Sequence, residues 1–150
     1  MSSERIVLTS INQENKKILN HILEGFFDYT ILSASLDNFL NSGTHHLIVA
    51  LNESKVVVGF ISYVDIFHPD KHTQVFINEL SVHPSYQRLG IGTKLMRHAF
   101  RYAEKHAYYV WVATEMENHE ADQFYQRLKP NSKQASWFYD WKVNQEVEND

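Results

Sequence analysis

Hydrophobic and polar positions along this chain follow two periods, one of about two residues and one near 3.6, and each period predicts its own kind of element. Apolar runs rich in β-branched and aromatic residues predict strands, and turn residues at 52–54 predict a hairpin. The predicted strands are residues 6–8, 46–51, 55–67, 73–82, 108–113 and 135–143. Because residues 108–113 are apolar throughout, we expect that strand to be buried on both faces.

Apolar residues that recur every three or four positions predict helices in four segments. These segments are residues 12–27, 35–40, 92–106 and 118–128. The clearest is 92–106, where charged residues lie opposite one apolar stripe. The stripe consists of Leu95, Met96, Ala99, Phe100 and Ala103.

The order of the predicted elements is β-α-α-β-β-β-α-β-α-β, with antiparallel hairpins before β-α-β crossovers. This order predicts an α/β fold of mixed α+β character in a single domain over residues 1–150. We expect a twisted, mostly antiparallel sheet of six to seven strands flanked by about four helices. The polar residues at 144–150 predict a frayed tail.

Composition excludes several functional classes. The chain of 150 residues is 43% hydrophobic and 21% charged, as in ordinary globular proteins, and its formal net charge of -4 argues against a nucleic-acid partner. It contains no cysteine, which excludes disulfides, thiolate zinc sites and Cys nucleophiles. His68 and His72 have the spacing of metal ligands on a helix, but Pro69 between them predicts a turn, so we expect no metal site.

The same sequence predicts a protein that is not held in a membrane. No apolar run approaches the roughly 20 residues that cross a bilayer. Residues 1–5 lack the apolar core of a signal peptide. We therefore expect a cytoplasmic protein without a membrane partner.

The strongest chemical signal is the segment 87–92, Gln-Arg-Leu-Gly-Ile-Gly, which joins a predicted strand to the clearest helix. Two glycines at that junction let backbone N–H groups converge at the positive end of a helix, where an anion binds. A dinucleotide-binding fingerprint needs a third glycine, which is absent because Lys94 and Leu95 occupy that region. A P-loop needs Gly-Lys-Ser/Thr, and residues 92–94 read Gly-Thr-Lys.

The pattern Gln/Arg-x-x-Gly-x-Gly/Ala after an antiparallel strand resembles the acyl-CoA pyrophosphate loop of the GNAT N-acetyltransferases. A second segment, Asn-His-Glu-Ala-Asp-Gln-Phe-Tyr at 118–125, begins 26 residues after Gly92 and is similar to the Asn-x-x-Ala-x-x-Phe-Tyr motif of that family. The resemblance covers residues 5–142. It implies acetyl-CoA as the co-substrate and transfer of its acetyl group to a primary amine. The Gly-Phe that usually follows the family's helix is replaced by Lys129-Pro130, which puts the loop geometry there in doubt.

The resemblance also implies a binding site for acetyl-CoA. The strand before the loop would splay at a bulge near 80–82 and pair with the pantetheine arm, while the loop amides would hold the pyrophosphate. The 118–125 helix would present Asn118 and a small Ala121 to the arm. The implied binding residues are Leu80, Ser81, Val82, Gln87, Arg88, Leu89, Gly90, Ile91, Gly92, Thr93, Asn118 and Ala121.

Direct attack of an amine on the thioester needs a proton acceptor and a proton donor. Tyr125 shares a helix face with Asn118 and Ala121, and the resemblance implies that it protonates the leaving thiolate. Its neighbour Phe124 is expected to pack in the core. Glu79 is the candidate base, acting directly or through water, and its alternative role is that of an ordinary strand-end carboxylate. His83 precedes a proline, where backbone restriction favours a structural role.

The acceptor amine is the part that the sequence determines least. We expect its pocket between the first helices, the turn at 68–72 and the segment before Trp137. The layout is similar to aminoglycoside N-acetyltransferases that modify the 3-amino group, and carboxylates that can hold such a polycation are Asp28, Glu115 and Asp140. The alternatives are a protein lysine or N-terminal amine as acceptor, and a non-catalytic acyl-CoA-binding domain. The aromatic run at 137–141 favours a homodimer formed through the C-terminal strand.

Overall fold

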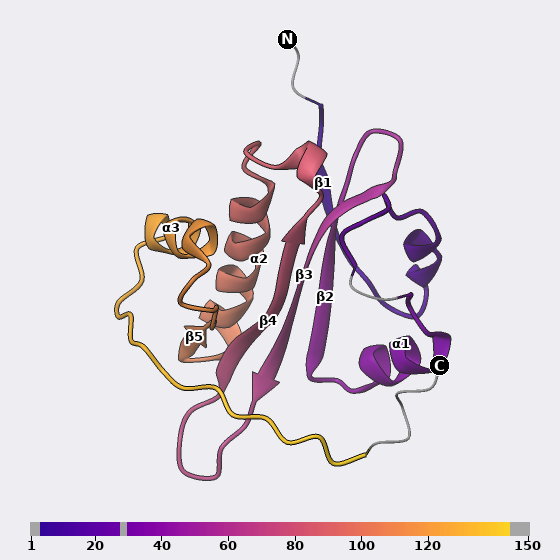
Figure 1. The fold of residues 1–150 in the computed structure, drawn as a ribbon. Coiled ribbons are helices and arrows are strands. Elements are labelled where there is room, and N and C mark those ends of the chain that lie inside the picture. Colours follow the sequence, from indigo (N-terminus) through magenta and orange to yellow (C-terminus); the bar gives the residue numbers. More distant parts are fainter. Residues whose placement is uncertain (1–3, 28–29, 145–150) are drawn as a thin grey trace. The chain divides into compact units, whose positions relative to one another are not determined.

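The computed structural model describes residues 4–27 and 30–144. The chain divides into two compact units, Met1–Ala113 and Thr114–Asp150. The first unit contains a sheet with helices on both faces, and the second contains one helix followed by extended chain (Figure 1). Asp28 and residues 145–150 of the predicted tail lie outside the described residues. No helix among the described residues is long and apolar enough to span a bilayer.

Five strands form the sheet of the first unit, in the order β1-β2-β3-β4-β5. Their bounds are Val7–Ser10 for β1, His45–Leu51 for β2, Val57–Ile66 for β3, Gln74–Val82 for β4 and Tyr109–Trp111 for β5. Neighbouring strands are antiparallel except β4 and β5, which are parallel and joined through helix α2, Ile91–His106. This mixed, mostly antiparallel sheet confirms the predicted fold class, with five strands among the described residues rather than six to seven.

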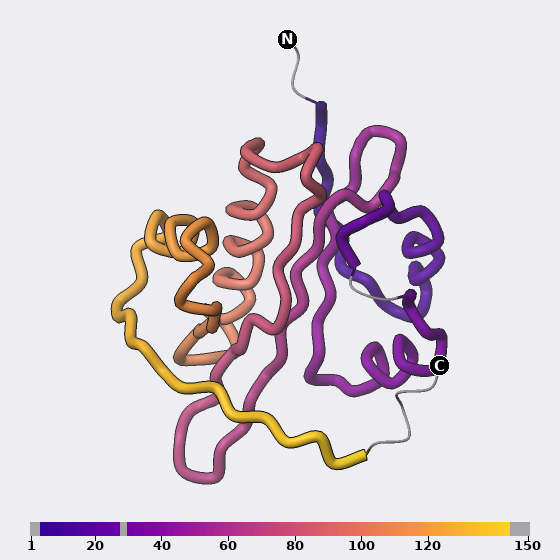
Figure 2. Tube along the Cα trace, viewed as in Figure 1, coloured from indigo at the N-terminus to yellow at the C-terminus, as the bar shows by residue number. Residues whose placement is uncertain are grey.

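Helices cover both faces of this sheet (Figure 2). On one face, α2 buries most of the predicted apolar stripe, namely Leu95, Met96, Ala99 and Ala103. On the other face lie the short 3-10 helix η1, Lys16–Asn20, and the helix α1, Ser33–Asn41. There Leu19, Val49 and Phe60 belong to one buried cluster. Each large apolar side chain removed from water contributes roughly 1.5–3 kcal/mol, so these two layers supply most of the unit's stability.

One extra residue in β4 interrupts the regular pairing with β3. Ser62 of β3 pairs with Glu79, and the next residue, Tyr63, pairs with Ile77. Asn78 therefore has no counterpart on β3 and forms a β-bulge. The expected bulge near 80–82 is corrected to this position, because the pairing with β3 is regular from residue 79 to the end of the strand.

The bulge decides which β4 side chains face each layer. The ring of Tyr63 lies 5.3 Å from that of Tyr102 on α2, so Tyr63 and its partner face α2. Side chains alternate along β3, which places Phe60 on the opposite face, toward η1 and α1. Ser81 pairs with Phe60, and Glu79 pairs with Ser62, which lies two residues further along β3 on the same face as Phe60. Ser81 and Glu79 therefore both face η1 and α1.

The helix expected over residues 12–27 is wrong, because side-chain and sheet interactions replace most of it. The Asn12 Oδ1 accepts hydrogen bonds from the N–H groups of Glu14 and Asn15, which holds a turn before η1. After η1, the Leu23 N–H donates to the Val57 carbonyl and the Val57 N–H donates to His21. Residues 21–23 therefore form a bridge to β3, and only the 3-10 turn between these two anchors is helical.

Two expectations about strands are also corrected. The strand expected to be buried on both faces is the short β5, whose Tyr109 and Trp111 are 47% and 36% exposed. It pairs with only three residues of β4. The strand expected at 135–143 is absent: residues 133–144 have no regular structure. Alternating side chains favour a strand only where a neighbouring backbone pairs with it.

The second unit contains the helix α3, His119–Arg127. The Asn118 Oδ1 accepts a hydrogen bond from the Ala121 N–H at 3.1 Å and so caps its start. At its end, Lys129 adopts a left-handed φ of 56°, the conformation that glycine usually supplies after a helix. The replacement of the usual glycine is therefore accommodated by a strained lysine, and Pro130 prevents the helix from continuing.

Candidate active site

The loop that precedes α2 brings several backbone N–H groups to the positive end of a helix of 16 residues. Arg88 and Gly90 have left-handed φ values of 64° and 82°, which turn the chain sharply into the helix. Gly90 is the N-cap residue, and it has no side chain that would accept a hydrogen bond from the N–H groups of the first turn. That turn also contains no acidic residue that would repel an anion. Arg88 and Lys94 are both exposed beside this turn. These features fit the binding of a pyrophosphate.

Hydrogen bonds fix the loop to the strand that precedes it. The Gln87 side chain donates from Nε2 to the Val82 carbonyl at 3.0 Å. The His83 N–H donates to the Val58 carbonyl of β3 at 2.8 Å, and its Nδ1 accepts from the Ser85 N–H at 3.1 Å. These contacts confirm the structural role expected of His83, which caps the short 3-10 helix η2, Pro84–Tyr86.

The predicted loop residues differ in exposure. Gln87, Arg88, Leu89 and Gly90 are exposed, Gly92 and Thr93 are half-buried, and Ile91 is buried. Ile91 packs against Gly59 of β3, where a Cβ would lie 3.3 Å from Ile91 Cγ2. The glycine at position 59 therefore lets the start of α2 approach the sheet closely.

The β4 segment that contains Glu79, Leu80, Ser81 and Val82 continues past the end of β5. The pairs between β4 and β5 stop at Phe76, before the bulge at Asn78. Beyond this point the two parallel strands no longer pair, which is the geometry in which a pantetheine arm can add alongside β4. The Glu79 side chain is exposed, as its candidate role as a base requires.

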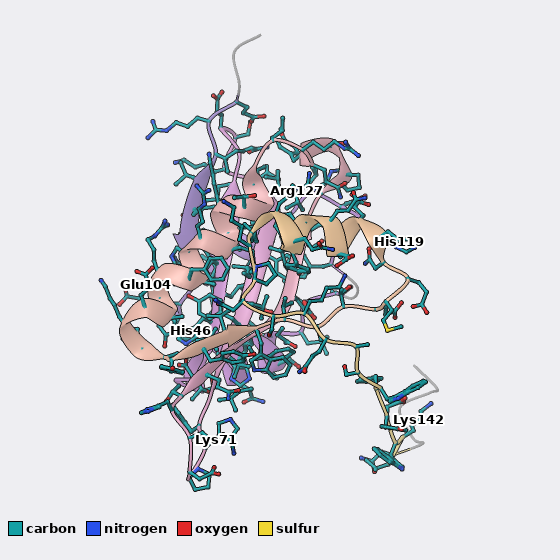
Figure 3. The ribbon with its side chains drawn as sticks, turned by 90° about the vertical axis from the view of Figure 1, so that its left-hand side faces the viewer. His46, Lys71, Glu104, His119, Arg127 and Lys142 are labelled. Atoms are coloured by element: carbon teal, nitrogen blue, oxygen red, sulfur yellow. The ribbon has the colours of Figure 1, made fainter. Side chains whose placement is uncertain are left out.

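The remaining predicted acetyl-CoA and catalytic residues lie in the second unit: Asn118 caps α3, and Ala121 and Tyr125 lie on it. Figure 3 shows His119 and Arg127 at the two ends of this helix, which contains Ala121 and Tyr125 between them. Tyr125 is half-buried, and burial raises the pKa of its hydroxyl above the ordinary value. That hydroxyl therefore stays protonated at neutral pH and is suited to donate a proton. The Phe124 ring lies 5.2 Å from that of Tyr125.

A polar cluster between the sheet and α2 was not predicted from the sequence. His46 Nε2 and Asp65 Oδ2 are 3.0 Å apart, and the Tyr102 hydroxyl donates to the same oxygen at 2.8 Å. Burial, with Asp65 close by, raises the pKa of Tyr63 to about 12, and the pKa of Tyr102 is raised as well. The cluster joins β2, β3 and α2, and no periodicity in the sequence points to these three residues as a group.

A cavity lies among the residues from η1 to α1. The predicted acceptor pocket included the first helices, the turn at 68–72 and the segment before Trp137. The cavity is lined by the N-terminal elements alone, between residues 16 and 36. Within the described part of the chain, no group of three or more His, Asp or Glu residues is arranged to hold a metal ion.

Comparison with known proteins identifies the family. The model of the acetyltransferase (GNAT) family matches residues 16–129, so the chain belongs to this family of acetyltransferases. A search by sequence among curated proteins finds no match. The resemblance inferred from the loop and from the 118–125 motif is thereby confirmed.

Solved structures with the same fold include aminoglycoside acetyltransferases. The acetyltransferase meta-AAC0020, from an uncultured soil metagenomic sample, has a TM-score of 0.78 at 20% identity over 93% of this chain and 97% of that one, in structures with trehalose and with sisomicin. AAC(6')-Iy, in complex with the bisubstrate analog CoA-S-monomethyl-acetylneamine, has a TM-score of 0.75 at 17% identity over 92% of this chain and 99% of that one. At these identities the likeness establishes the fold.

Proposed function

We propose that this protein transfers the acetyl group of acetyl-CoA directly to a primary amine of a small molecule. The observation that carries the proposal is the loop from Gln87 to Gly92, with its left-handed Gly90 at the start of α2, in a member of the GNAT family. Its exposed amides and the neighbouring Arg88 and Lys94 are suited to the pyrophosphate of the co-substrate. The edge of β4 beyond Phe76 would pair with the pantetheine arm, and Asn118 and Ala121 would border it.

The proposed reaction balances without a covalent enzyme intermediate. The amine nitrogen attacks the thioester carbon, a C–N bond forms, and the C–S bond breaks with its electrons leaving on sulfur. Glu79, directly or through water, accepts the proton that the amine loses. Tyr125 donates a proton to the sulfur, because burial raises the pKa of its hydroxyl and the group is protonated at neutral pH. The products are an N-acetyl amide and CoA.

Several acceptor classes agree with this chemistry. Aminoglycosides are one candidate, because the neighbouring structures include acetyltransferases named for them, one of them in complex with sisomicin. Modification at the 3-amino group remains a prediction of the sequence, and a role in antibiotic resistance would follow from an aminoglycoside acceptor. A protein amine is the alternative acceptor, and a domain that only binds acyl-CoA is the alternative without catalysis.

The C-terminal residues support a proposed homodimer. Trp137, Phe138, Tyr139, Trp141 and Val143 are between 70% and 88% exposed, which is unusual for large apolar side chains that lie so close together. Pairing of this segment with the same segment of a second copy would cover them. Light scattering on the purified protein should give twice the mass of the chain. The triple variant Trp137→Ser, Tyr139→Ser and Trp141→Ser should return it to the mass of one chain.

The test of the enzymatic proposal is the release of free CoA thiol from acetyl-CoA in the presence of aminoglycosides, polyamines, amino acids and peptides. We expect thiol release with at least one small-molecule amine and its loss in the double variant Tyr125→Phe and Glu79→Gln. Measurable CoA binding without thiol release from any amine would support the non-catalytic alternative. Release with peptides alone would support the protein-directed one.

A further inference from the structure

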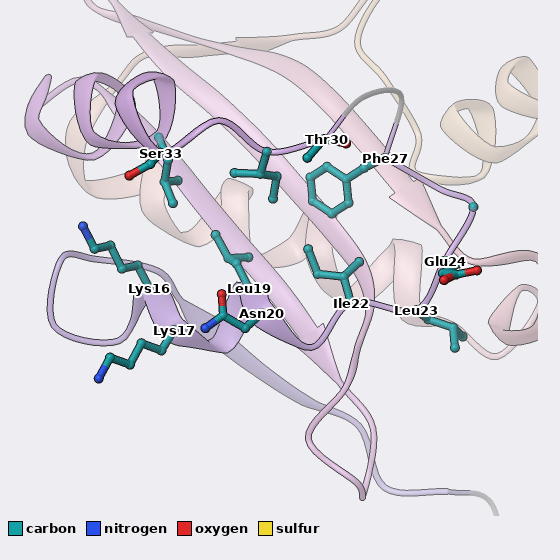
Figure 4. A pocket seen from close by; sticks show the side chains of 13 residues that line it. Lys16, Lys17, Leu19, Asn20, Ile22, Leu23, Glu24, Phe27, Thr30 and Ser33 are labelled. Atoms are coloured by element: carbon teal, nitrogen blue, oxygen red, sulfur yellow. The ribbon is translucent and has the colours of Figure 1, made fainter.

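The cavity between η1, the following loop and α1 has a volume of about 700 Å³ (Figure 4). Pockets that hold small molecules commonly measure roughly 300–1,000 Å³. Its floor is apolar and formed by side chains of the cluster beneath η1 and α1. These are Leu19, Ile22, Phe27, Ile31 and Leu36.

The cavity lies close to the β4 segment on which the proposed reaction depends. The ring of Phe27, in the cavity wall, stacks on Phe60 at 4.2 Å with 10° between the planes. Phe60 pairs with Ser81 across the sheet, and the Ser81 hydroxyl donates to the Phe26 carbonyl at 3.5 Å. Because Glu79 and Ser81 face η1 and α1, the candidate base is on the same side of the sheet as the cavity.

The charged residues among the described lining of the cavity are Lys16, Lys17 and Glu24. Figure 4 shows Lys16 and Lys17 on one side and Glu24 on the other. The Lys16 Nζ lies 2.8 Å from the Asp37 Oδ1, and hydrogen bonds from Lys16 and Gln13 hold the pKa of Asp37 below its ordinary value. Lys17 forms no such ion pair within the described residues, so its ammonium is the cation available to a ligand.

This distribution of charge does not match a polycation. An aminoglycoside carries several ammonium groups, and the described residues that line the cavity offer them one carboxylate, Glu24, beside two lysines. Like charges placed together at an interface oppose binding. An apolar body on the floor, with one carboxylate beside Lys17, matches both the apolar lining and the available cation.

We infer that this cavity binds the acceptor, and that the acceptor is a small apolar amine that also carries a carboxylate, such as a hydrophobic amino acid. The inference rests on the proposed acetyl transfer and names its substrate class. The acetyl group moves from sulfur to the amino nitrogen, the amine loses a proton to the base, and the sulfur gains one. The products are an N-acetyl amino acid and CoA.

The test compares two amines with the same apolar body. Phenylalanine carries a carboxylate and 2-phenylethylamine lacks it, and thiol release is measured for both at saturating acetyl-CoA. We expect Lys17→Gln to raise the KM for phenylalanine about tenfold, the effect of losing one charge-assisted hydrogen bond. The KM for 2-phenylethylamine should not change. The matched variant Lys105→Gln, at an exposed position in the last turn of α2, should leave both KM values unchanged.

The failures of this inference and of the acetyl-transfer proposal are distinguishable. The inference would be overturned, with the enzyme still active, if the protein acetylates aminoglycosides but not phenylalanine. It would also be overturned if the KM for phenylalanine is the same in Lys17→Gln and in the unmodified protein. If no amine releases thiol, calorimetric titration of phenylalanine into the CoA-bound protein still tests the cavity. Binding weakened tenfold by Lys17→Gln would support the assigned ligand class, and its absence would overturn it.

Discussion

Ile91, the first residue of α2, is in close contact with Gly59 of β3: a Cβ at position 59 would lie 3.3 Å from Ile91 Cγ2 and 3.3 Å from the Ser81 carbonyl. Two parts of the proposed site meet at this glycine, since Ile91 begins the helix that would hold the pyrophosphate and Ser81 belongs to the strand edge that would lie beside the pantetheine arm. The relative position of the two parts thus depends on the absence of one methyl group.

Gly59→Ala is expected to displace the start of α2 and to weaken CoA binding several-fold. Overpacking of this kind typically costs about 1–3 kcal/mol of stability, which urea unfolding would measure alongside a calorimetric Kd. The second substitution Ile91→Ala, made in the Gly59→Ala background, should recover part of the affinity because it removes one of the two close contacts. Equal affinity for CoA in Gly59→Ala and the unmodified protein would show that the loop does not depend on this contact.

Gly90→Val should reduce CoA affinity at least tenfold. A β-branched residue at the left-handed φ of 82° is strained by about 1–3 kcal/mol, and relief of that strain would change the direction of the loop amides. Gly43→Val is the matched control, because Gly43 has a similar φ of 75° and, like Gly90, open space around a Cβ, but lies between α1 and β2. If Gly90→Val and Gly43→Val have similar free energies of unfolding but only Gly90→Val binds CoA weakly, the loss of affinity is due to the loop. Equal CoA affinities of the two variants would argue against a role of the loop in binding.

Tyr125→Phe should lower kcat by roughly a hundredfold or more, the usual contribution of a general acid, with the CoA Kd unchanged. Because burial raises the pKa of Tyr125 above its ordinary value of 10, its hydroxyl is mostly protonated at every pH below about 9. The kcat of the unmodified enzyme should therefore show no loss that depends on this residue between about pH 7 and about pH 9. Tyr139→Phe, at an exposed tyrosine of the same unit, serves as the control. A kcat that Tyr125→Phe leaves intact would remove Tyr125 from the mechanism.

Tyr102→Phe should destabilise the first unit by about 1–3 kcal/mol, because Asp65 would lose a hydrogen-bond donor in a buried position. The Asp65 side chain is 8% exposed, and its Oδ1 already has no hydrogen-bond partner within the described residues. The free energy of urea unfolding measures the effect. The exposed Tyr108 provides the matched Tyr→Phe control, for which we expect a change within about 0.5 kcal/mol.

The sequence predicted correctly those elements whose structure depends on residues close together in the chain. The stripe on α2 and the turn between β2 and β3 are written in consecutive residues, and both were predicted correctly. The helix expected at 12–27 failed because its apolar spacing competes with the Asn12 turn and with pairing to Val57, which is distant in sequence. The same limit applies to the candidate site: the loop was visible in the sequence, whereas the Asp65 cluster and the cavity depend on contacts between separate elements.

The bulge at Asn78 has a consequence for how β4 tolerates changes in length. The alternation of side chains begins again at this residue, so the positions before and after it occupy opposite phases of the strand. Deletion of Asn78 would leave Glu79 opposite Ser62, because Glu79 would then follow Ile77 in a regular strand. Loss of the bulge at unchanged length would instead pair Glu79 with Ile61 and turn it toward α2, without removing any chemical group from the chain. A β4 paired in that register could therefore fold and still be inactive. In this strand, the spacing of the residues carries as much information as their identity.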